Sequence, residues 1–580
     1  MTLALRVRFV LCAALLLAAR PAAADRPNPG TFLKSEPAVT VAPDGAVQVV
    51  VETWDSCTGG QAFLGVRPLD APLDYPAYRV SGTLSPDDGG RRLTVRLHLK
   101  DLEYIRADVN DLAGRGGGSV CLRLQILGER LRVLDRSFAY RRTPDGRYHS
   151  APALAEGPFL DLVSDRGAVV SGAFDVPANF RLTLDPGGRI IAPPTPAQTF
   201  ELPLDGLEPA TRYTYRLTWE AGGGQEFSTP VYAFRTAPAP GAAAPVRFAV
   251  LCDSRGNSLG GEYLVEGVSQ PALQALLNQA AAAGAEFILF PGDLVSGFTT
   301  DPEDMARQLR AWNRATAPIA ARIPLYEGMG NHDQTVQWMA EGGKGDYLPR
   351  VGEESGEALF ARHFVNPVNG PDSAAAGFPT YRENVYSFDW GPAHFVMLNN
   401  TWFLKGPGPL AAGEPGLRQG FFRPEQLEWL DRDLAAARAR GQEHLFVLAH
   451  DPAFPNGGHV QDAMWWKGQD PEILALRDHF WGLLVRHRVA AAFFGHEHNY
   501  SRTLVDARVD SAYTHPVWQI VTGGAGAPFY QRDREVPWAG AVQAFYPLSH
   551  LSLVEVDGSR VTLSVITPEG AVVERVDLVP

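Results

Sequence analysis

Cysteine is scarce in this chain of 580 residues, which holds four, and no segment after the first 24 residues is apolar enough to cross a bilayer. An excess of basic residues is also missing, because 52 Lys and Arg stand against 65 Asp and Glu, for a net charge of −13. An acidic chain argues against broad nucleic-acid binding, since phosphate backbones attract a basic face. Composition is otherwise ordinary for a folded protein, and the length predicts about three domains.

The first 24 residues are predicted to form a cleaved secretory signal. Arg6 and Arg8 supply a basic start, residues 9–19 an apolar stretch, and residues 22–24 the small side chains of a cleavage site. A membrane anchor is the alternative, but this apolar stretch is short for a span of about 20 residues. Cleavage removes three arginines and no acid, so the net charge falls to −16. We therefore expect an exported protein, periplasmic or extracellular, without a stable membrane span.

The cysteines leave room for one disulfide. Cys12 departs with the predicted signal, and Cys57 and Cys121 lie in the same N-terminal region, so export would allow a bond between them. Two buried free thiols are the alternative. Cys252 ends an apolar run, and we interpret it as a small core residue rather than a metal ligand.

Residues 25–155 are predicted to form a β-rich domain whose role the sequence leaves open. Runs of β-type composition, such as residues 46–52 and 120–127, alternate with turn clusters rich in Gly, Asp and Pro. No group of residues in this region has the pattern of a chemical site. Contact with surface polymers is one role open to this domain and the next, and it belongs to the alternative of a secreted binding protein.

Residues 156–236 are predicted to form a second β-domain. The stretch 206–216 resembles the tyrosine corner of fibronectin type III-like sandwiches, in which a tyrosine hydroxyl bonds to nearby backbone. We expect Tyr213 and Tyr215 to pack in the core, with ligand contact as the alternative. A Pro/Ala linker, residues 237–245, follows and is too poor in large apolar side chains to pack.

Residues 246–580 alternate between strand and helix patterns, which predicts a layered α/β domain with its site on the loops after strand ends. Apolar runs predict strands at 246–251, 286–290, 395–398, 445–448, 490–494 and 517–521. Helices are expected at 271–283, 301–315, 424–440 and 471–488. The expected fold class is thus a multidomain chain in which all-β domains precede an α/β layered domain.

Residue types that bind metals follow several of these apolar runs, namely Asp253, Asp293, Asn331, His450, His496 and His498. Carboxylate and amide oxygens with imidazole nitrogens, gathered from several strand ends, can build a pocket for two metal ions. Two ions about 3.5–4 Å apart need a bridging ligand. A lone aspartate there is usually a helix cap and a lone histidine a surface group, but caps do not explain an ordered set.

Two residues beside Asn331 are predicted to take part in catalysis. His332 would face the rim of the pocket, where an imidazolium can protonate a departing alkoxide. Asp333 could orient the ring of His332. The pair therefore predicts a general acid next to a metal ligand.

These ordered blocks resemble those of the calcineurin-like metallophosphoesterase superfamily. The matching blocks are Cys252-Asp253-Ser254-Arg255, Gly292-Asp293, Gly330-Asn331-His332-Asp333, His450 and Gly495-His496-Glu497-His498. The resemblance covers about residues 246–580 and is strongest to the purple acid phosphatase-like branch, which also carries a fibronectin-like domain before the catalytic one. It implies two divalent or mixed-valence ions of Fe, Zn or Mn. By this resemblance Asp253 and His498 would hold the first ion and Asn331, His450 and His496 the second, with Asp293 between them.

Two positions depart from the family's pattern. The family usually has a histidine two residues after the first aspartate, where this chain has Arg255, and purple acid phosphatases have a tyrosine where it has Ser296. Without that tyrosine there is no phenolate-to-iron charge transfer, so we expect a colourless protein. A guanidinium cannot ligate a metal, but it can fork onto phosphate oxygens, with an outward-turned arginine as the alternative. Asn257 and His459 are further candidates for substrate contact, although a solvated loop histidine is commoner.

The expected function is hydrolysis of a small phosphomonoester outside the cytoplasm, by metal-activated water with His332 as general acid. A phosphodiesterase or nucleotidase with the same site is one alternative, because substrate width depends on rim loops such as residues 341–373. A secreted binding protein that keeps the fold without activity is the other. Arg255 and Ser296 support that alternative, and the otherwise complete donor set argues against it.

Overall fold

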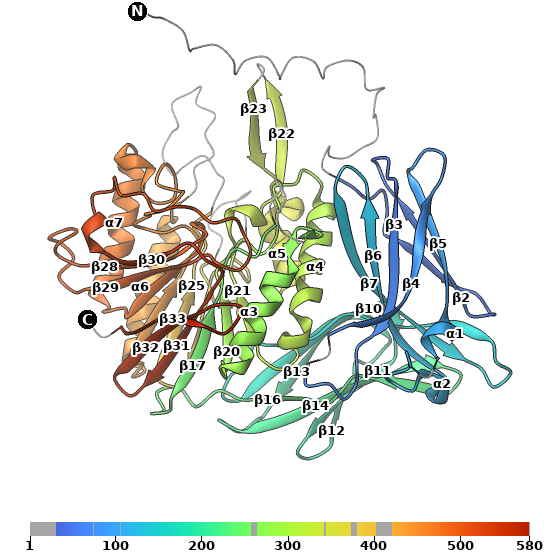
Figure 1. Ribbon diagram of the computed structural model, residues 1–580. Helices are drawn as coiled ribbons and strands as arrows, with labels where there is room; N and C mark the ends of the chain where they lie inside the picture. Colours follow the sequence, from blue (N-terminus) through green and yellow to red (C-terminus); the bar gives the residue numbers. More distant parts are fainter. Residues whose placement is uncertain are drawn as a thin grey trace, which may run out of the picture.

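The computed structural model of this protein describes residues 31–73, 75–104, 106–256, 264–341, 344–372, 380–401 and 420–578. The predicted signal and Asn257 lie outside the described residues. Along the chain, β-sheets without large helices come first, and a part in which helices cover two sheets follows (Figure 1). The expectation that β-rich domains precede an α/β layered domain is confirmed.

Eight strands and two short helices open the described chain, and we call them the first sandwich. They are β1 (Ala38–Val41), β2 (Ala46–Glu52), β3 (Gly59–Val66), β4 (Ala77–Pro86), β5 (Arg92–His98), α1 (Leu99–Leu102), α2 (Leu112–Arg115), β6 (Gly117–Leu127), β7 (Leu131–Arg142) and β8 (Tyr148–Ala151). The long strand β4 pairs with β3 over most of its length and with β5 at its end, so one sheet folds over itself. Val47, Val49 and Val51 point into the core because successive side chains of a strand face opposite sides.

Cys57 and Cys121 are buried free thiols in this sandwich. In the pairing of β3 with β6, Gly59 faces Leu127, whereas Cys121 faces Gly65, six residues further along. At about 3.4 Å per residue this offset is about 20 Å, while the Cα atoms of a disulfide are about 4.4–6.8 Å apart. The expected disulfide is therefore wrong, and the alternative of two thiols holds.

Two further sheets face each other after the first sandwich. One contains β9 (Leu154–Asp161), β10 (Gly167–Ala178) and β13 (Ala197–Asp205), and the other β11 (Phe180–Asp185), β12 (Arg189–Ile191), β14 (Arg212–Gly222), β15 (Gln225–Ser228) and β16 (Tyr232–Arg235). Tyr213 and Tyr215 are both buried on β14. The Tyr213 hydroxyl accepts the main-chain N–H of Glu208 at 2.9 Å, and the Tyr215 hydroxyl donates to the carbonyl of Ala321 at 2.8 Å. Both rings therefore pack in the core, and Tyr215 also joins these sheets to the part that follows.

The Pro/Ala segment after β16 packs at its start. Ala237 and Pro238 are buried, and Gly391 exchanges main-chain hydrogen bonds with Pro238 and Gly241 at 3.3 and 2.7 Å. The expectation that this segment cannot pack is wrong there, because main-chain bonds hold it where large side chains are missing.

Two stacked sheets with helices outside them form the rest of the chain (Figure 1). The six-stranded sheet has the order β21 (Leu325–Glu327), β20 (Phe287–Phe290), β17 (Val246–Val250), β31 (Leu551–Asp557), β32 (Arg560–Ile566) and β33 (Val572–Asp577). The seven-stranded sheet has the order β24 (Tyr386–Trp390), β25 (Ala393–Met397), β26 (His444–Leu448), β27 (Ala491–Phe494), β29 (Val517–Thr522), β28 (Tyr500–Val505) and β30 (Val542–Tyr546). The helices are α3 (Gln270–Ala282), α4 (Pro302–Ala320), α5 (Gly356–His363), α6 (Pro424–Ala439) and α7 (Pro471–Arg486), and β22 (Val336–Glu341) and β23 (Lys344–Pro349) form a separate hairpin.

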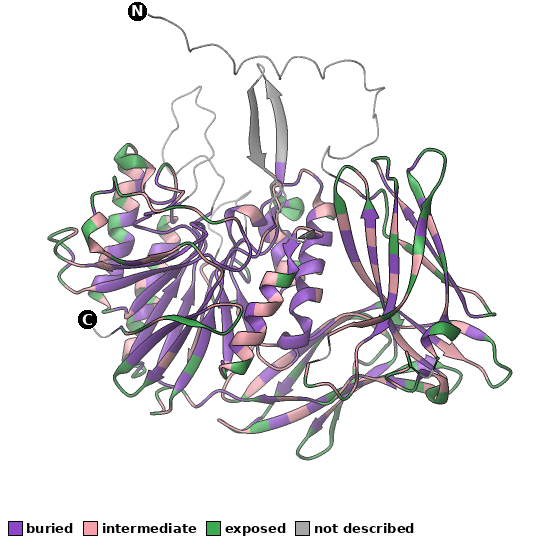
Figure 2. Cartoon of the chain, viewed as in Figure 1, coloured by how far each residue is buried: buried purple, intermediate pink, exposed green. Residues whose placement is uncertain are grey.

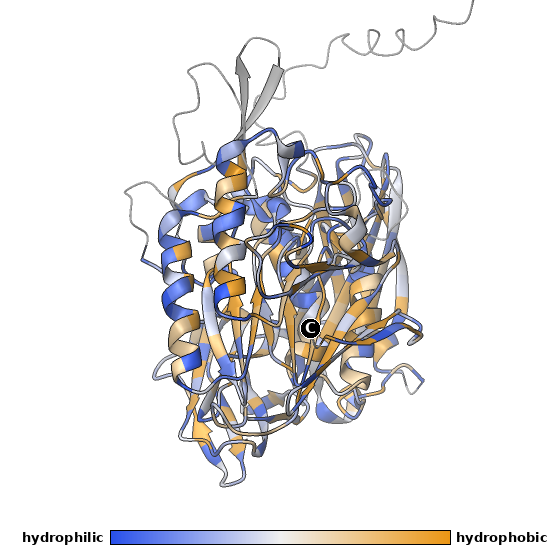
Figure 3. Cartoon of the chain, turned by 90° about the vertical axis from the view of Figure 1, so that its left-hand side faces the viewer, coloured by the Kyte–Doolittle hydropathy of each residue, from blue (hydrophilic) through white to orange (hydrophobic). Residues whose placement is uncertain are grey.

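An aromatic core joins the two sheets. The ring of Phe248 on β17 lies 4.9 Å from that of Phe395 on β25 and 5.1 Å from that of Phe446 on β26, between centroids. The central strands are apolar throughout because the other sheet covers one face and helices cover the other (Figure 3). This sandwich fixes the strand ends that carry the predicted donors.

Helix α4 differs most from its predicted bounds, since it continues to Ala320 rather than residue 315. The Asp301 carboxylate accepts the N–H of Glu303 at its start, as an N-cap does. Ala317 and Ile319 in the added turn are buried (Figure 2). Tertiary packing therefore extends the helix beyond its sequence pattern. Among the described residues, no helix combines the length and apolar character needed to cross a bilayer.

The first sandwich reaches the α/β part through a small hairpin of β18 (Leu264–Val265) and β19 (Val268–Ser269). Val265 pairs in parallel with Val133 on β7, so the sheet of the first sandwich continues into the hairpin. Glu266 in its turn forms ion pairs with Arg136 of the first sandwich and Arg314 of α4, at 2.7 and 2.9 Å. The first sandwich thus contacts a segment that leads into the predicted site.

Candidate metal centre

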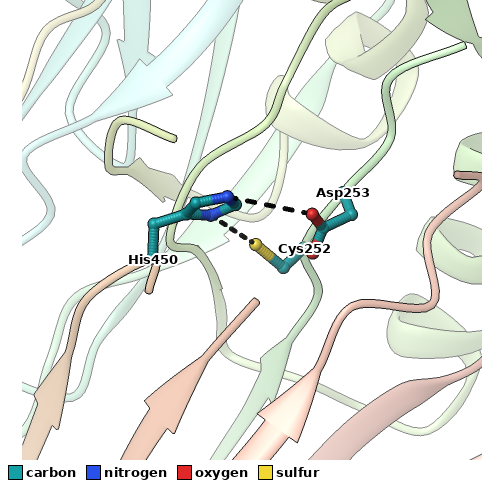
Figure 4. Close-up of side chains that lie close together, drawn as sticks. All are labelled: Cys252, Asp253 and His450. Carbon is teal, nitrogen blue, oxygen red and sulfur yellow. Dashed lines mark hydrogen bonds and ion pairs between the residues drawn. The ribbon is translucent and has the colours of Figure 1, made fainter. Parts of the chain in front are cut away.

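The six predicted donors follow the ends of five strands in both stacked sheets. They follow β17 (Asp253), β20 (Asp293), β21 (Asn331), β26 (His450) and β27 (His496 and His498). Strands β17, β20 and β21 are mutually parallel, as are β26 and β27, so within each sheet their carboxyl ends lie at one edge. Asn331 is 7% exposed and the other donors 1% or less. Figure 4 shows His450 reaching from one sheet toward Cys252 and Asp253 of the other.

The main chain at these strand ends takes an unusual shape. The φ angles of Asp253, Asp293, His496 and His498 are 66°, 53°, 68° and 34°, a left-handed region that non-glycine residues rarely adopt. Glycines precede or follow these residues where a larger side chain would clash. A Cβ on Gly495, for example, would lie 2.6 Å from Oδ2 of Asp253. Tight turns therefore bring the carboxylates and imidazoles inward.

His450 faces three oxygens. Its Nδ1 lies 3.1 Å from the carbonyl oxygen of Pro291 and donates to it, which leaves a lone pair on Nε2. That Nε2 lies 3.2 Å from Oδ1 of Asn331, 3.3 Å from Oδ1 of Asp293 and 3.9 Å from Oδ1 of Asp253. Burial opposes a charge on the ring, but the two carboxylates outweigh it and raise the pKa of His450 to about 10. In the absence of a cation, the second proton on His450 therefore supplies the positive charge among these acceptors.

His496 completes the same group. Its Nε2 lies 3.2 Å from the buried carboxylate of Asp451, and its Nδ1 lies 3.0 Å from Oδ1 of Asn331. Burial lowers the pKa of His496 to about 3, and the charge of His459 acts in the same direction. In a metal-bound histidine one ring nitrogen binds the ion and the other faces a carboxylate or carbonyl, so Nδ1 of His496 would face an ion and Nε2 would face Asp451.

We call the group of Asp293, Asn331, His450 and His496 the second position. The distances between its donor atoms are those expected around one metal ion. Ligand atoms about 2.1 Å from one ion lie roughly 3.0–3.4 Å apart in octahedral or tetrahedral geometry. The donor atoms of Asn331 and His496 lie 3.0 Å apart, and those of Asn331 and His450 lie 3.2 Å apart. The donor atoms of His450 and Asp293 lie 3.3 Å apart. Nitrogen and oxygen donors suit Fe, Zn or Mn.

The first position comprises Asp253, Asp293 and His498, whose donor atoms all lie within 4.8 Å of one another. Nδ1 of His498 donates to the carbonyl of Pro528 at 2.6 Å, so its Nε2 is an acceptor, 3.5 Å from Oδ1 of Asp253. The Arg255 guanidinium enters this position, with Nη2 3.2 Å from Nε2 of His498 and Nε 3.2 Å from Oδ2 of Asp293. Arg255 therefore turns inward, and the alternative of an outward-turned side chain is wrong. The guanidinium thus contacts two of the three donor side chains of this position.

His332 lies at the site, but Asp333 does not orient it. Nδ1 of His332 lies 2.7 Å from the carbonyl oxygen of Ser296, and the main-chain N–H donates to Oδ1 of Asp293 at 2.9 Å. Burial lowers the pKa of His332 to about 4. The carboxylate of Asp333 instead accepts main-chain N–H groups of Gly330, Leu294 and Val295, at 2.8, 3.1 and 3.3 Å. Asp333 was expected beside the ring because it is adjacent in sequence, but it closes the main-chain turn there.

His459 lies against the second position. Its ring centre is 3.6 Å from that of His496, and its Nδ1 lies 3.0 Å from the carboxylate of Asp462. Tyr530 stacks on His498 with ring centres 4.6 Å apart. The sequence prediction missed Asp451, Asp462 and Tyr530. Asp451 directly follows a predicted ligand and Asp462 lies three residues after His459, whereas nothing in the pattern indicates Tyr530.

Comparison with known proteins identifies this part of the chain. Residues 266–500 match the family model for calcineurin-like phosphoesterase. The chain carries a calcineurin-like phosphoesterase domain. This family contains hydrolases that act on phosphoester bonds, and purple acid phosphatases are among the relatives, as the sequence blocks predict. The matched span begins after Asp253 and Arg255.

The individual relatives are distant. The chain is 28% identical over 195 residues to probable inactive purple acid phosphatase 9 of Arabidopsis thaliana, over 32% of this chain and 25% of that protein. It is 24% identical over 370 residues to acid phosphatase A of Cryphonectria parasitica, over 56% of this chain and 68% of that protein. Purple acid phosphatase PPD1 from yellow lupin seeds has the same fold, with a TM-score of 0.55 and 17% identity over 92% of both chains. The chain thus spans a quarter of the first relative and about two thirds of the second.

Proposed function

We propose that this protein is a metal-dependent hydrolase of small phosphomonoesters. The observation that carries the proposal is a chain of close contacts among buried donor atoms, from His496 to Asn331, from Asn331 to His450 and from His450 to Asp293, in a phosphoesterase domain. A divalent cation held by these residues would supply Lewis acidity for a phosphoryl oxygen and for a water molecule. The chain's own residues then orient the ester and move its protons.

His332 is proposed as the general acid. The carbonyl of Ser296 accepts its Nδ1–H, so the ring is held in one orientation and Nε2 is the nitrogen that delivers a proton to the leaving oxygen. Burial keeps the free ring neutral, but a phosphate dianion nearby favours the imidazolium. His332 therefore becomes charged when the substrate arrives.

Arg255 and His459 are proposed to bind the phosphate. The guanidinium of Arg255 pairs with the carboxylate of Asp293 and brings a fixed positive charge to the centre. Burial opposes a charge on His459, but the bond to Asp462 and the charge of that carboxylate raise its pKa. Two cationic groups on either side of the donors thus suit a dianionic monoester better than a diester with one charge.

Metal analysis with a chromogenic phosphomonoester and its diester tests the proposed function. We expect a bound transition metal, and monoester turnover that a chelator removes and the metal restores. Faster turnover of the diester would favour the phosphodiesterase or nucleotidase alternative. Bound metal without any turnover would favour an inactive binding protein, an alternative suggested by the name of the Arabidopsis relative.

We also propose the domain division and location expected from the sequence. The proposed domains are residues 25–155, a fibronectin type III-like sandwich at 156–236, and the catalytic domain at 246–580. The sheet orders β13-β10-β9 and β12-β11-β14-β15, with the Tyr213 hydroxyl bonded to main chain, support the second assignment. Export after cleavage at residue 24, with contact of the β-domains to surface polymers, completes the proposal. Mass spectrometry of the secreted protein tests the cleavage, and a mature chain that retains residues 1–24 would contradict it.

A further inference from the structure

The first position holds a positive charge that belongs to the chain itself. Nε of Arg255 lies 3.2 Å from Oδ2 of Asp293, and Nη2 lies 3.2 Å from Nε2 of His498. Both acceptor atoms belong to the donor set of that position. The guanidinium therefore contacts two of the three side chains that a metal ion would need.

The lone pair of His498 decides between an ion and the arginine. Its Nδ1 carries the proton, because it donates to the carbonyl of Pro528 at 2.6 Å. Nε2 then has a single lone pair, which accepts the N–H of Arg255. A metal ion at the first position requires the same lone pair. The two occupants are thus mutually exclusive, and charge repulsion in a buried site adds to the exclusion.

The main chain holds Arg255 in this place. Its N–H donates to the carbonyl of Asp293 at 3.2 Å, and the residue forms a β-bridge with Val268. The next N–H, that of Gly256, donates to the carbonyl of Gly267 at 3.1 Å. The side chain is only 14% exposed. A backbone fixed on both sides, with a buried side chain, gives the guanidinium no easy way out of the site.

We propose that Arg255 replaces the first metal ion, so that the centre binds one divalent cation, at the second position. The guanidinium supplies the charge that balances Asp253 and Asp293 in place of the missing ion. This inference rests on the proposed metal-dependent function, and it changes the number of ions from two to one. Substrate phosphate would then lie between one cation and a guanidinium rather than between two cations.

Counting metal ions in the full-length protein tests this inference. The probe is Mn²⁺ alone, added in excess and removed by gel filtration, with metal per chain measured by mass spectrometry. We expect one ion in the wild type and two in Arg255→His, which restores the imidazole at that position. In electron paramagnetic resonance, the wild type should give the six-line signal of isolated Mn²⁺ and the variant the signal of a coupled pair.

Two neighbouring histidines provide a matched pair of variants that locates the ion. His496→Ala removes a donor of the second position and should lose the bound ion. His498→Ala removes a donor of the first position only and should keep it. Circular dichroism and thermal unfolding of both variants establish that they are folded. If the ion lies at the first position instead, the two results are reversed.

Each other outcome contradicts a specific step. Two ions in the wild type overturn the inference and leave the proposed function intact. One ion in both the wild type and Arg255→His overturns the exclusion of the first ion by the guanidinium. No ion and no turnover in the wild type overturn the proposed function itself. Should Arg255→His fail to fold, the wild-type resonance signal and the histidine pair still decide the number and place of the ions.

Discussion

Arg136 and Glu266 form a two-pronged ion pair between the first sandwich and the hairpin before α3, with N–O distances of 2.7 and 2.9 Å. Their side chains are 14% and 7% exposed. The adjacent Gly267 carbonyl accepts the N–H groups of Gly256 and Ser296, which flank the metal centre. The first sandwich, whose role the sequence leaves open, therefore braces the segment that carries Arg255.

Replacing Glu266 by Gln should destabilise the protein by about 3 kcal/mol, because it leaves the nearly buried Arg314 without its partner at 2.9 Å and leaves Arg136 only its more exposed partner Glu36. The measurement is the free energy of unfolding in urea. Glu226→Gln is a matched control, since Glu226 pairs with Arg181 at 2.7 and 2.8 Å on the surface, where both side chains are more than 40% exposed. The control should cost at most about 1 kcal/mol. Equal losses in the two variants would contradict a bracing role for Glu266.

Asp293→Ala should lose the bound metal and lower kcat/KM by on the order of 10³-fold or more. Asp293 contributes an oxygen to the second position and also pairs with Arg255. Metal content and turnover are measured on the same sample. Asp506→Ala, at a partly exposed aspartate that pairs with Arg508, should change neither. A metal-loaded Asp293→Ala protein would contradict the placement of the ion.

His332→Gln should keep the metal and slow the hydrolysis of esters with poor leaving groups by about 10²–10⁴-fold. Esters of acidic phenols leave without a proton, so their hydrolysis should slow much less. The measurement is kcat for a series of aryl and alkyl phosphates. An equal loss across the series would rule out the role of general acid.

Asp161 should make stability fall as the pH rises. It is partly buried on β9 beside the hydroxyl of Ser171, and this burial raises its pKa to about 7, with Glu201 acting in the same direction. An unfolded aspartate titrates near 3.9, so the folded state holds the proton longer. The stabilisation is complete below about pH 4 and is lost as the pH rises toward 7.

Asp161→Asn removes this titration. The unfolding temperature of the variant should rise relative to that of the wild type between pH 4 and 7. Above pH 7 the difference between the two unfolding temperatures should stay constant. Thermal unfolding in a pH series measures it. A difference between the two proteins that does not change with pH would show that Asp161 is ionised throughout.

Iron-loaded protein should be colourless. Ser296 stands where purple acid phosphatases have the tyrosine that gives their colour, and its hydroxyl donates to the carbonyls of Gly256 and Gly267 at 3.1 Å each. A visible absorption spectrum after loading with Fe³⁺ tests this. A strong band in the visible range would require another phenolate ligand, and Tyr530 beside His498 would be the first residue to replace.

The donor set could be predicted because each member directly follows an apolar strand, and parallel strands align their carboxyl ends. Asp333 could not be placed in the same way. Its neighbour in sequence is His332, but its carboxylate is used by main-chain N–H groups that only the folded loop brings together. Asp451 and Tyr530 contact their histidines across different loops, so no local pattern connects them.

The same limit applies to the N-terminal part. Alternation of polar and apolar residues predicts the strands that contain Cys57 and Cys121, but not their register, and the register separates the thiols. Arg255 was recognised as a departure from the family's pattern. Its inward direction depends on the bridge to Val268 and the turn at Asp253, which form only in the folded chain.

Four of the donors, Asp253, Asp293, His496 and His498, have left-handed main-chain angles that cost about 1–2 kcal/mol each in a non-glycine residue. Glycine at any of them would relieve that cost and remove a donor at once. A lineage that no longer used the centre would therefore gain stability by mutation to glycine, and genetic drift would run in that direction. The side chains at these four turns are therefore the price in stability of keeping donors at the strand ends.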